Sequence, residues 1–219
     1  MRKHAAILPG AVIGLLGGGQ LARMTGLAAR AMGYHIVVLD PDPKCAAAPI
    51  ADEVIAANFD DVEAAARLAR RSSVVTYEIE RIAPEPLRAA AALAPLRPQA
   101  AVLECVQDRE QQKQWLATRG FPLGAWRPVA SAPDLAEAVA QFGVCRVKRT
   151  RGGYDGRAQM RVATVRESSA AISELGGACV AEQELSLAME LSVLVARSPA
   201  GEMVAHPPAM NWHEDGILV

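Results

Sequence analysis

Residues 147–159 read VKRTRGGYDGRAQ, in which a lysine near the end of an apolar strand precedes a basic, glycine-rich loop. Such a loop can bring positive charge and backbone N–H donors to a polyphosphate while it remains free to close over the ligand. Tyr154 and Asp155 add directional polar groups at its tip. A solvated hairpin with ordinary turn glycines is the competing interpretation. The segment predicts a mobile phosphate-binding loop between two strands.

The sequence on either side of this loop alternates between helical and strand patterns. Helical signals, including a serine cap at Ser131 and a stop at Gly120, cover 108–119, 131–142 and 167–175. Strand signals cover 126–129, 144–148, the stretch directly after the loop, 178–182 and a longer run over 189–197. This order is typical of an α+β domain, which we place at residues 108–219.

Residues 1–107 show a different pattern, in which short apolar runs alternate with alanine-rich helical stretches. We expect strands at 11–16, 35–39 and 73–76 and helices at 20–32 and 61–71. Parallel strands with crossover helices produce this pattern. The predicted fold class is therefore α/β, with a Rossmann-like domain over 1–107 followed by the α+β domain.

A glycine turn, GLLGGGQ at residues 14–20, joins the first expected strand to the first expected helix. A phosphate could approach its backbone N–H groups at the helix start, and Asp40 at the end of the second strand adds to the likeness of a dinucleotide fingerprint. The spacing is not GxGxxG, however, and glycine turns follow the first strand of many unrelated α/β domains. A nicotinamide-binding protein and a non-catalytic nucleotide-binding module therefore remain as alternatives.

The bulk composition excludes some partners. Lys plus Arg total 23 and Asp plus Glu total 24, so the chain lacks the basic footprint of a nucleic-acid binder. Pro9 interrupts the apolar amino-terminal stretch, which indicates a strand instead of a signal peptide, and no run approaches membrane-spanning length. The four cysteines are far apart and form no CxxC pair, which favours reduced thiols over a zinc site. We expect a cytoplasmic protein.

Six strings, GGGQLARM, TYEIE, DREQQKQ, VKRTRGGYDGRAQ, ELSVLVAR and NWHEDGIL, together resemble the ordered signature of the 5-(carboxyamino)imidazole ribonucleotide synthases, ATP-grasp enzymes of purine biosynthesis. The resemblance spans essentially the whole chain, and GGYDG is its most specific part. It implies a pre-ATP-grasp domain followed by an ATP-grasp domain. It also implies an ADP-forming ligase in which ATP activates bicarbonate as carboxyphosphate, whose carboxyl group passes to the exocyclic amine of 5-aminoimidazole ribonucleotide. Mg²⁺ and a homodimer are further implications.

The resemblance also implies roles for particular residues. Arg109 and Lys148 would contact the ATP phosphates, and the loop at 153–159 would fold over them. The run 182–185 would line the adenine and Glu190 would bind the ribose, although exposed glutamates beside strands are usually only solvated. The implied ATP-binding set is Arg109, Lys148, Gly153, Tyr154, Asp155, Gly156, Arg157, Ala158, Gln159, Glu182, Gln183, Glu184, Leu185, Glu190 and His213. The implied catalytic residues are Tyr154, Asp155 and Arg157, and the implied far wall of the substrate site is Gln20 and Glu78.

Two features depart from the family pattern. The family continues well beyond Val219, and the resemblance places the Mg²⁺ ligands there. We therefore expect no metal ligand in this chain, little activity from it alone, and an unpaired, partly apolar sheet edge that lowers solubility. The second departure is Ala158, where the family commonly has glycine. Alanine would hinder the loop if a positive φ is needed there, and it would be harmless if it only starts the returning strand.

Overall fold

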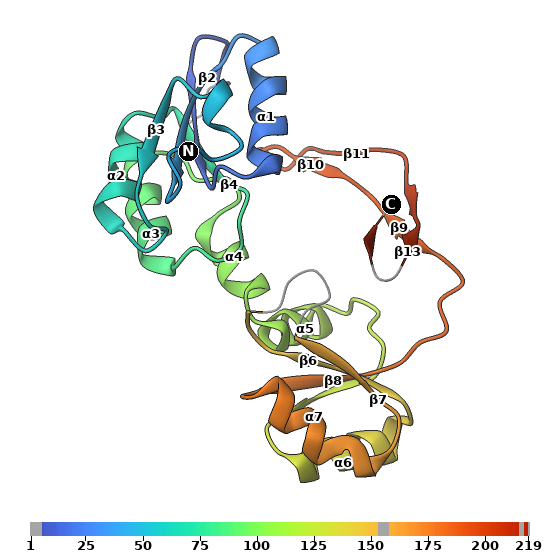
Figure 1. Cartoon of the computed structure of the whole chain (residues 1–219). Coiled ribbons are helices and arrows are strands. Elements are labelled where there is room, and N and C mark those ends of the chain that lie inside the picture. Colours follow the sequence, from blue (N-terminus) through green and yellow to red (C-terminus); the bar gives the residue numbers. More distant parts are fainter. Residues whose placement is uncertain (1–5, 153–157, 215–216, 219) are drawn as a thin grey trace. The chain divides into compact units, whose positions relative to one another are not determined.

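The computed structural model describes residues 6–152, 158–214 and 217–218 of the 219-residue chain. The chain forms two compact units, one ending at Gln107 and the other beginning at Asp108 (Figure 1). Both units combine helices with strands, so the predicted α/β class is confirmed. All four cysteines are free thiols.

A four-stranded parallel sheet forms the centre of the first unit. Its strands are β1 (Val12–Leu16), β2 (His35–Asp40), β3 (Glu53–Ala56) and β4 (Val74–Tyr77), in the order β3-β2-β1-β4. Ile13 of β1 lies opposite Ile36 of β2 and Val74 of β4. This order, with the first strand inside the sheet, is that of a Rossmann-like half-sheet, as the sequence predicted.

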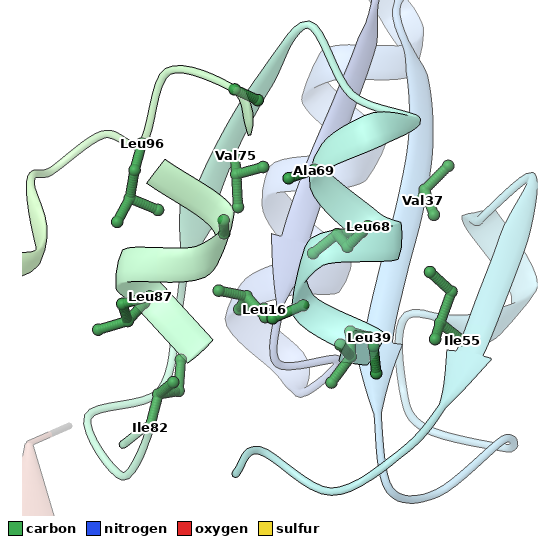
Figure 2. Packing of buried hydrophobic residues seen from close by; sticks show 14 of the residues in the cluster. Leu16, Val37, Leu39, Ile55, Leu68, Ala69, Val75, Ile82, Leu87 and Leu96 are labelled. Carbon is green, nitrogen blue, oxygen red and sulfur yellow. The ribbon is translucent and has the colours of Figure 1, made fainter. Parts of the chain in front are cut away.

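Helices cover both faces of this sheet. They are α1 (Gln20–Ala31), α2 (Val62–Arg70), α3 (Pro84–Leu93), α4 (Ala100–Val106) and the short 3₁₀ turn η1 (Ala48–Ile50). Successive β1 residues point to opposite faces, so Leu16 packs with α2 and α3 while Leu15 packs with α1. Figure 2 shows Leu68 of α2 among Leu16 and Leu39 of the sheet. The two cores hold the carboxyl ends of the strands, and the glycine turn, in place.

The second unit is built on a four-stranded antiparallel sheet. Its strands are β5 (Trp126–Val129), β6 (Cys145–Arg149), β7 (Gln159–Val162) and β8 (Cys179–Gln183), in the order β5-β8-β6-β7. Its helices are α5 (Arg109–Thr118), α6 (Ala132–Phe142) and α7 (Ser168–Leu175), with a 3₁₀ turn η2 (Val165–Glu167). Val147 and Ala181 of the sheet pack with Leu135 of α6 and Leu175 of α7 in a buried core. The helices α6 and α7 therefore cover one face of the sheet.

The chain after β8 forms short antiparallel pairs. The strands are β9 (Glu190–Ser192), β10 (Val195–Arg197), β11 (Met203–Ala205), β12 (Ala209–Asn211), β13 (His213–Glu214) and β14 (Ile217–Leu218). β9 pairs with β12, β10 with β11, and β13 with β14. The single strand predicted over 189–197 was wrong, because its two halves pair with different partners. Many large apolar side chains are exposed here, namely Leu185, Leu187, Met189, Leu191, Val193, Leu194, Val195, Met203, Val204, Met210, Trp212 and Leu218.

Candidate functional site

Charged side chains gather on the face of the second unit's sheet that α6 and α7 leave uncovered. Side chains alternate along β6 and β8, so the core residue Val147 is followed by Lys148 on the other face, and Ala181 by Glu182. The Lys148 Nζ donates a hydrogen bond to Glu182 Oε2 at 3.0 Å. Two residues predicted for the ATP site are thus in direct contact.

Helix α5 adds a second lysine to this carboxylate. The Lys113 Nζ lies 3.1 Å from Glu182 Oε1 and 5.9 Å from the centroid of the Trp126 ring. The side chains of Lys113, Lys148 and Glu182 are only 16%, 29% and 22% exposed. Burial alone would raise the pKa of Glu182, but the hydrogen bond and charge of Lys148, and then those of Lys113, outweigh it and lower that pKa. Glu182 is therefore an ionised carboxylate held between two cations.

Backbone and side-chain contacts fix the start of α5 beside the end of β6. Asp108 caps the helix by accepting the N–H groups of the next turn, and it also accepts Arg151 Nε at 2.9 Å. The Arg109 N–H donates to the Thr150 carbonyl at 2.9 Å, and its Nη1 donates to the Arg149 carbonyl at 3.1 Å. These contacts hold Arg109 near the strand end that follows Lys148.

The side chains of residues 182–185 lie on different sides of the sheet. Glu184 accepts hydrogen bonds from Arg146 Nε at 2.8 Å and Arg161 Nε at 3.0 Å on the same face as Glu182. Gln183 Nε2 instead donates to the Phe142 carbonyl at the end of α6. Leu185 is exposed. Two of the four predicted adenine-lining side chains therefore share a face with Lys148.

The returning strand brings Gln159 opposite Lys148 in the sheet. Ala158, just before it, has a φ of 57°, in the left-handed region that favours glycine. Of the two interpretations of this alanine, the structure therefore supports the one in which a positive φ is needed. Gly153, Tyr154, Asp155, Gly156 and Arg157 lie outside the described residues.

Glu190 and His213 meet in the part of the chain that follows β8. The His213 Nδ1 lies 2.9 Å from Glu190 Oε2, which is an ion pair when the imidazole is protonated. The contact joins β9 to β13, two strands that do not pair through their backbones. Two further residues predicted for the nucleotide are thus neighbours.

The glycine turn of the first unit binds carboxylates of its own chain. The Gly18 N–H donates to Asp40 Oδ2 at 2.8 Å, and the Gly19 N–H donates to Glu78 Oε1 at 2.9 Å. These two N–H groups of the turn are therefore occupied, and the two carboxylates would repel an anion. Gln20 follows Gly19 directly and is exposed. The structure thus brings Gln20 and Glu78, the two residues predicted for the substrate wall, to one end of the parallel sheet.

Two kinds of feature are absent from the described ranges. No group of three or more His, Cys, Asp and Glu residues there is placed to hold a metal ion. No helix among those residues has the length and apolarity needed to cross a bilayer.

Comparison with known families accounts for both units. Residues 11–107 match the ribonucleotide synthetase pre-ATP-grasp domain, and residues 114–219 match the ATP-grasp domain. The N5-carboxyaminoimidazole ribonucleotide synthases of Brucella melitensis and Bacillus subtilis are 36% and 38% identical to this chain, each over 97% of it. The chain spans 60% and 56% of those relatives' lengths.

Solved structures agree with this assignment. The ADP complex of an N5-carboxyaminoimidazole ribonucleotide synthetase is 38% identical with a TM-score of 0.91, covering 99% of this chain and 58% of that one. The Aspergillus clavatus synthase in complex with ADP and 5-aminoimidazole ribonucleotide is 26% identical with a TM-score of 0.81, covering 95% of this chain and 55% of that one. The chain is thus a pre-ATP-grasp domain followed by an ATP-grasp domain, and it is similar along nearly its whole length to N5-carboxyaminoimidazole ribonucleotide synthases.

Proposed function

We propose that this chain supplies the nucleotide site of an ATP-dependent ligase that carboxylates 5-aminoimidazole ribonucleotide with bicarbonate, giving 5-carboxyaminoimidazole ribonucleotide in purine biosynthesis. The observation that carries the proposal is the sheet face opposite α6 and α7, on which Lys148 lies beside Glu182, with Arg109 at the adjoining strand end. ADP and 5-aminoimidazole ribonucleotide in complexes of relatives support the substrate assignment.

In this proposal the sheet face holds ATP. Arg109 and Lys148 contact its phosphates, and residues 153–159 cover them. Fixed cations at these positions stabilise the negative charge that develops on the transferred phosphoryl group. The run 182–185 lines the adenine. Glu190 accepts hydrogen bonds from the ribose hydroxyls, and its partner His213 orients that carboxylate.

The carboxylation step is assigned to the glycine loop and the first unit. Tyr154, Asp155 and Arg157 are assigned to the reaction of bicarbonate with the imidazole ribonucleotide. Gln20 and Glu78 of the first unit are assigned to binding of the imidazole ribonucleotide, and the Glu78 carboxylate is fixed by the Gly19 N–H. A carboxylate held in this way can accept hydrogen bonds from an amine or hydroxyl of the substrate.

ATP reaches such sites as its magnesium complex, in which the metal neutralises phosphate oxygens. The described residues offer no cluster of carboxylates to bind that metal. We therefore assign no residue of this chain to Mg²⁺.

We also propose that two copies of the chain associate through α1. Its outer side and the residue that follows it expose Leu21, Met24, Leu27 and Met32, while the small residues Ala22 and Ala29 face the sheet. Exposed apolar side chains grouped on one helix can mark an interaction surface. Two such surfaces packed together would bury on the order of 1,000 Å², the lower end for a specific dimer. Sedimentation of Leu21→Glu should show monomer where wild type shows dimer; a wild-type monomer would contradict this.

Calorimetric titration with MgATP, with NAD as a control ligand, tests the nucleotide assignment. Saturable binding of MgATP without binding of NAD is expected. ADP release that requires both 5-aminoimidazole ribonucleotide and bicarbonate would show ligase activity. Because little activity is expected from this chain alone, saturable MgATP binding without such turnover is the expected result, whereas no MgATP binding by the folded chain would contradict the nucleotide assignment.

A further inference from the structure

Lys113 is a largely buried cation that the proposed function does not use. It extends from α5 to Glu182 Oε1 at 3.1 Å, while Lys148 holds Glu182 Oε2 at 3.0 Å. Trp126 lies 5.9 Å from the same ammonium group and covers part of it. The carboxylate thus has one lysine on each oxygen.

The two lysines cannot remain equivalent once a polyphosphate binds. Phosphate oxygens compete with Glu182 for Lys148, because both are anionic acceptors for the same ammonium group. If Lys113 were absent, a phosphate that drew Lys148 away would leave Glu182 without either lysine. Such a state is strongly disfavoured for a carboxylate that is only 22% exposed. With Lys113 in place, Glu182 keeps a partner on its other oxygen.

We propose that Lys113 is a positioning residue of the nucleotide site, which holds Glu182 and thereby leaves Lys148 available to the phosphates. This inference rests on the proposed nucleotide binding. Anchoring of α5 is a weaker explanation, because the helix start is already tied down by the Arg151–Asp108 pair and by the Arg109 N–H bond to Thr150. Lys113 acts through Glu182, and no contact between Lys113 and the nucleotide is required.

Substitution at position 113 tests this role through MgATP affinity. Lys113→Met keeps the aliphatic stem and removes the charge, and we expect about tenfold weaker binding of MgATP, within the usual range for coupled charges. Lys113→Arg should restore most of the affinity because it keeps the cation. Arg119→Met is the matched control, since Arg119 is a cation 4.0 Å from the Trp115 ring at the end of the same helix and lies outside the cluster. It should bind MgATP as wild type does.

A double-mutant cycle with Glu182→Gln separates positioning from a structural effect. The amide that this substitution introduces carries no charge to restrain Lys148, so Lys113→Met should cost almost no affinity in that background. An equal loss in both backgrounds would overturn the inference, as would wild-type affinity for Lys113→Met. A folded wild-type chain that does not bind MgATP would instead refute the proposed nucleotide site, and this role with it. Thermal melting of each variant identifies any that fail to fold. If Lys113→Met does not fold, the MgATP affinity of Lys113→Arg tests the role, because this variant keeps the cation and should bind nearly as tightly as wild type.

Discussion

Substitution of Gly17 by alanine should destabilise the first unit more than the same change at another glycine with similar backbone angles. Gly17 has a φ of +97°, and a Cβ there would lie 2.8 Å from Glu78 Oε1 and 3.1 Å from Ile79 Cγ2. Glu78 cannot easily turn away, because its carboxylate accepts the Gly19 N–H at 2.9 Å. The added methyl group therefore meets both an unfavourable φ and a fixed neighbour.

Gly10 separates these two effects. It belongs to the same unit, has a φ of +90°, and would place a Cβ with nothing within 4 Å. Backbone strain alone should cost roughly 1–2 kcal/mol in Gly10→Ala. The close contacts should add about 1–2 kcal/mol in Gly17→Ala, giving roughly 3 kcal/mol in total.

Urea unfolding followed by far-UV circular dichroism measures the difference. With an m-value of about 2 kcal/mol per molar urea, the middle of the usual range, the midpoint of Gly17→Ala should lie about 0.5–1 M below that of Gly10→Ala. Equal midpoints for the two variants would refute the reasoning, because the contact with Glu78 would then contribute nothing.

Three further substitutions test other parts of the account. Ala158→Gly should stabilise the chain by about 0.5–1 kcal/mol in thermal melting, since it relieves a φ of 57°; a loss would mean that this angle is not strained. Tyr77→Phe should raise stability by about 1 kcal/mol, because the Tyr77 hydroxyl is buried without a hydrogen-bond partner among the described residues; destabilisation would reveal one. The pKa of Asp52 is lowered first by the Ile36 N–H at 2.7 Å and then by Arg30, so its stabilisation is present above the unfolded pKa and is lost as pH falls through the folded pKa. Asp52→Asn should therefore lower the free energy of unfolding at pH 7 by no more than about 1 kcal/mol, because the carboxylate is 36% exposed and water screens its charge. In acid the variant and wild type should be equally stable; a difference in stability that persisted in acid would contradict this.

The sequence predicted those elements whose pattern is local. The glycine turn before α1, the serine cap of α6 and the alternation in β6 each depend on neighbouring residues, and each element lies close to its expected position. β3 was not predicted, because a four-residue strand is defined by its pairing, with Val54 opposite Val38 of β2. α4 was missed for a similar reason, since only Leu103 of this short helix is buried.

The candidate site was predictable only in part. Lys148, Glu182 and Arg109 were named from motifs, but their contacts follow from the antiparallel register of β6 with β8 and from the docking of α5. Lys113 carried one usable signal, since it lies four residues after Arg109 and therefore on the same side of the helix. Its carboxylate partner is 69 positions away in sequence, and no local pattern indicates such a pair.

Calorimetric titration of the chain with MgATP, repeated with Lys148→Met and Arg119→Met, tests the central claim most directly. The account predicts saturable binding by wild type and by Arg119→Met, and about 100-fold weaker binding by Lys148→Met, as expected for loss of a charge-assisted bond to phosphate. Equal affinities for all three proteins, or no binding by a folded wild-type chain, would contradict the assignment of this sheet face as the nucleotide site.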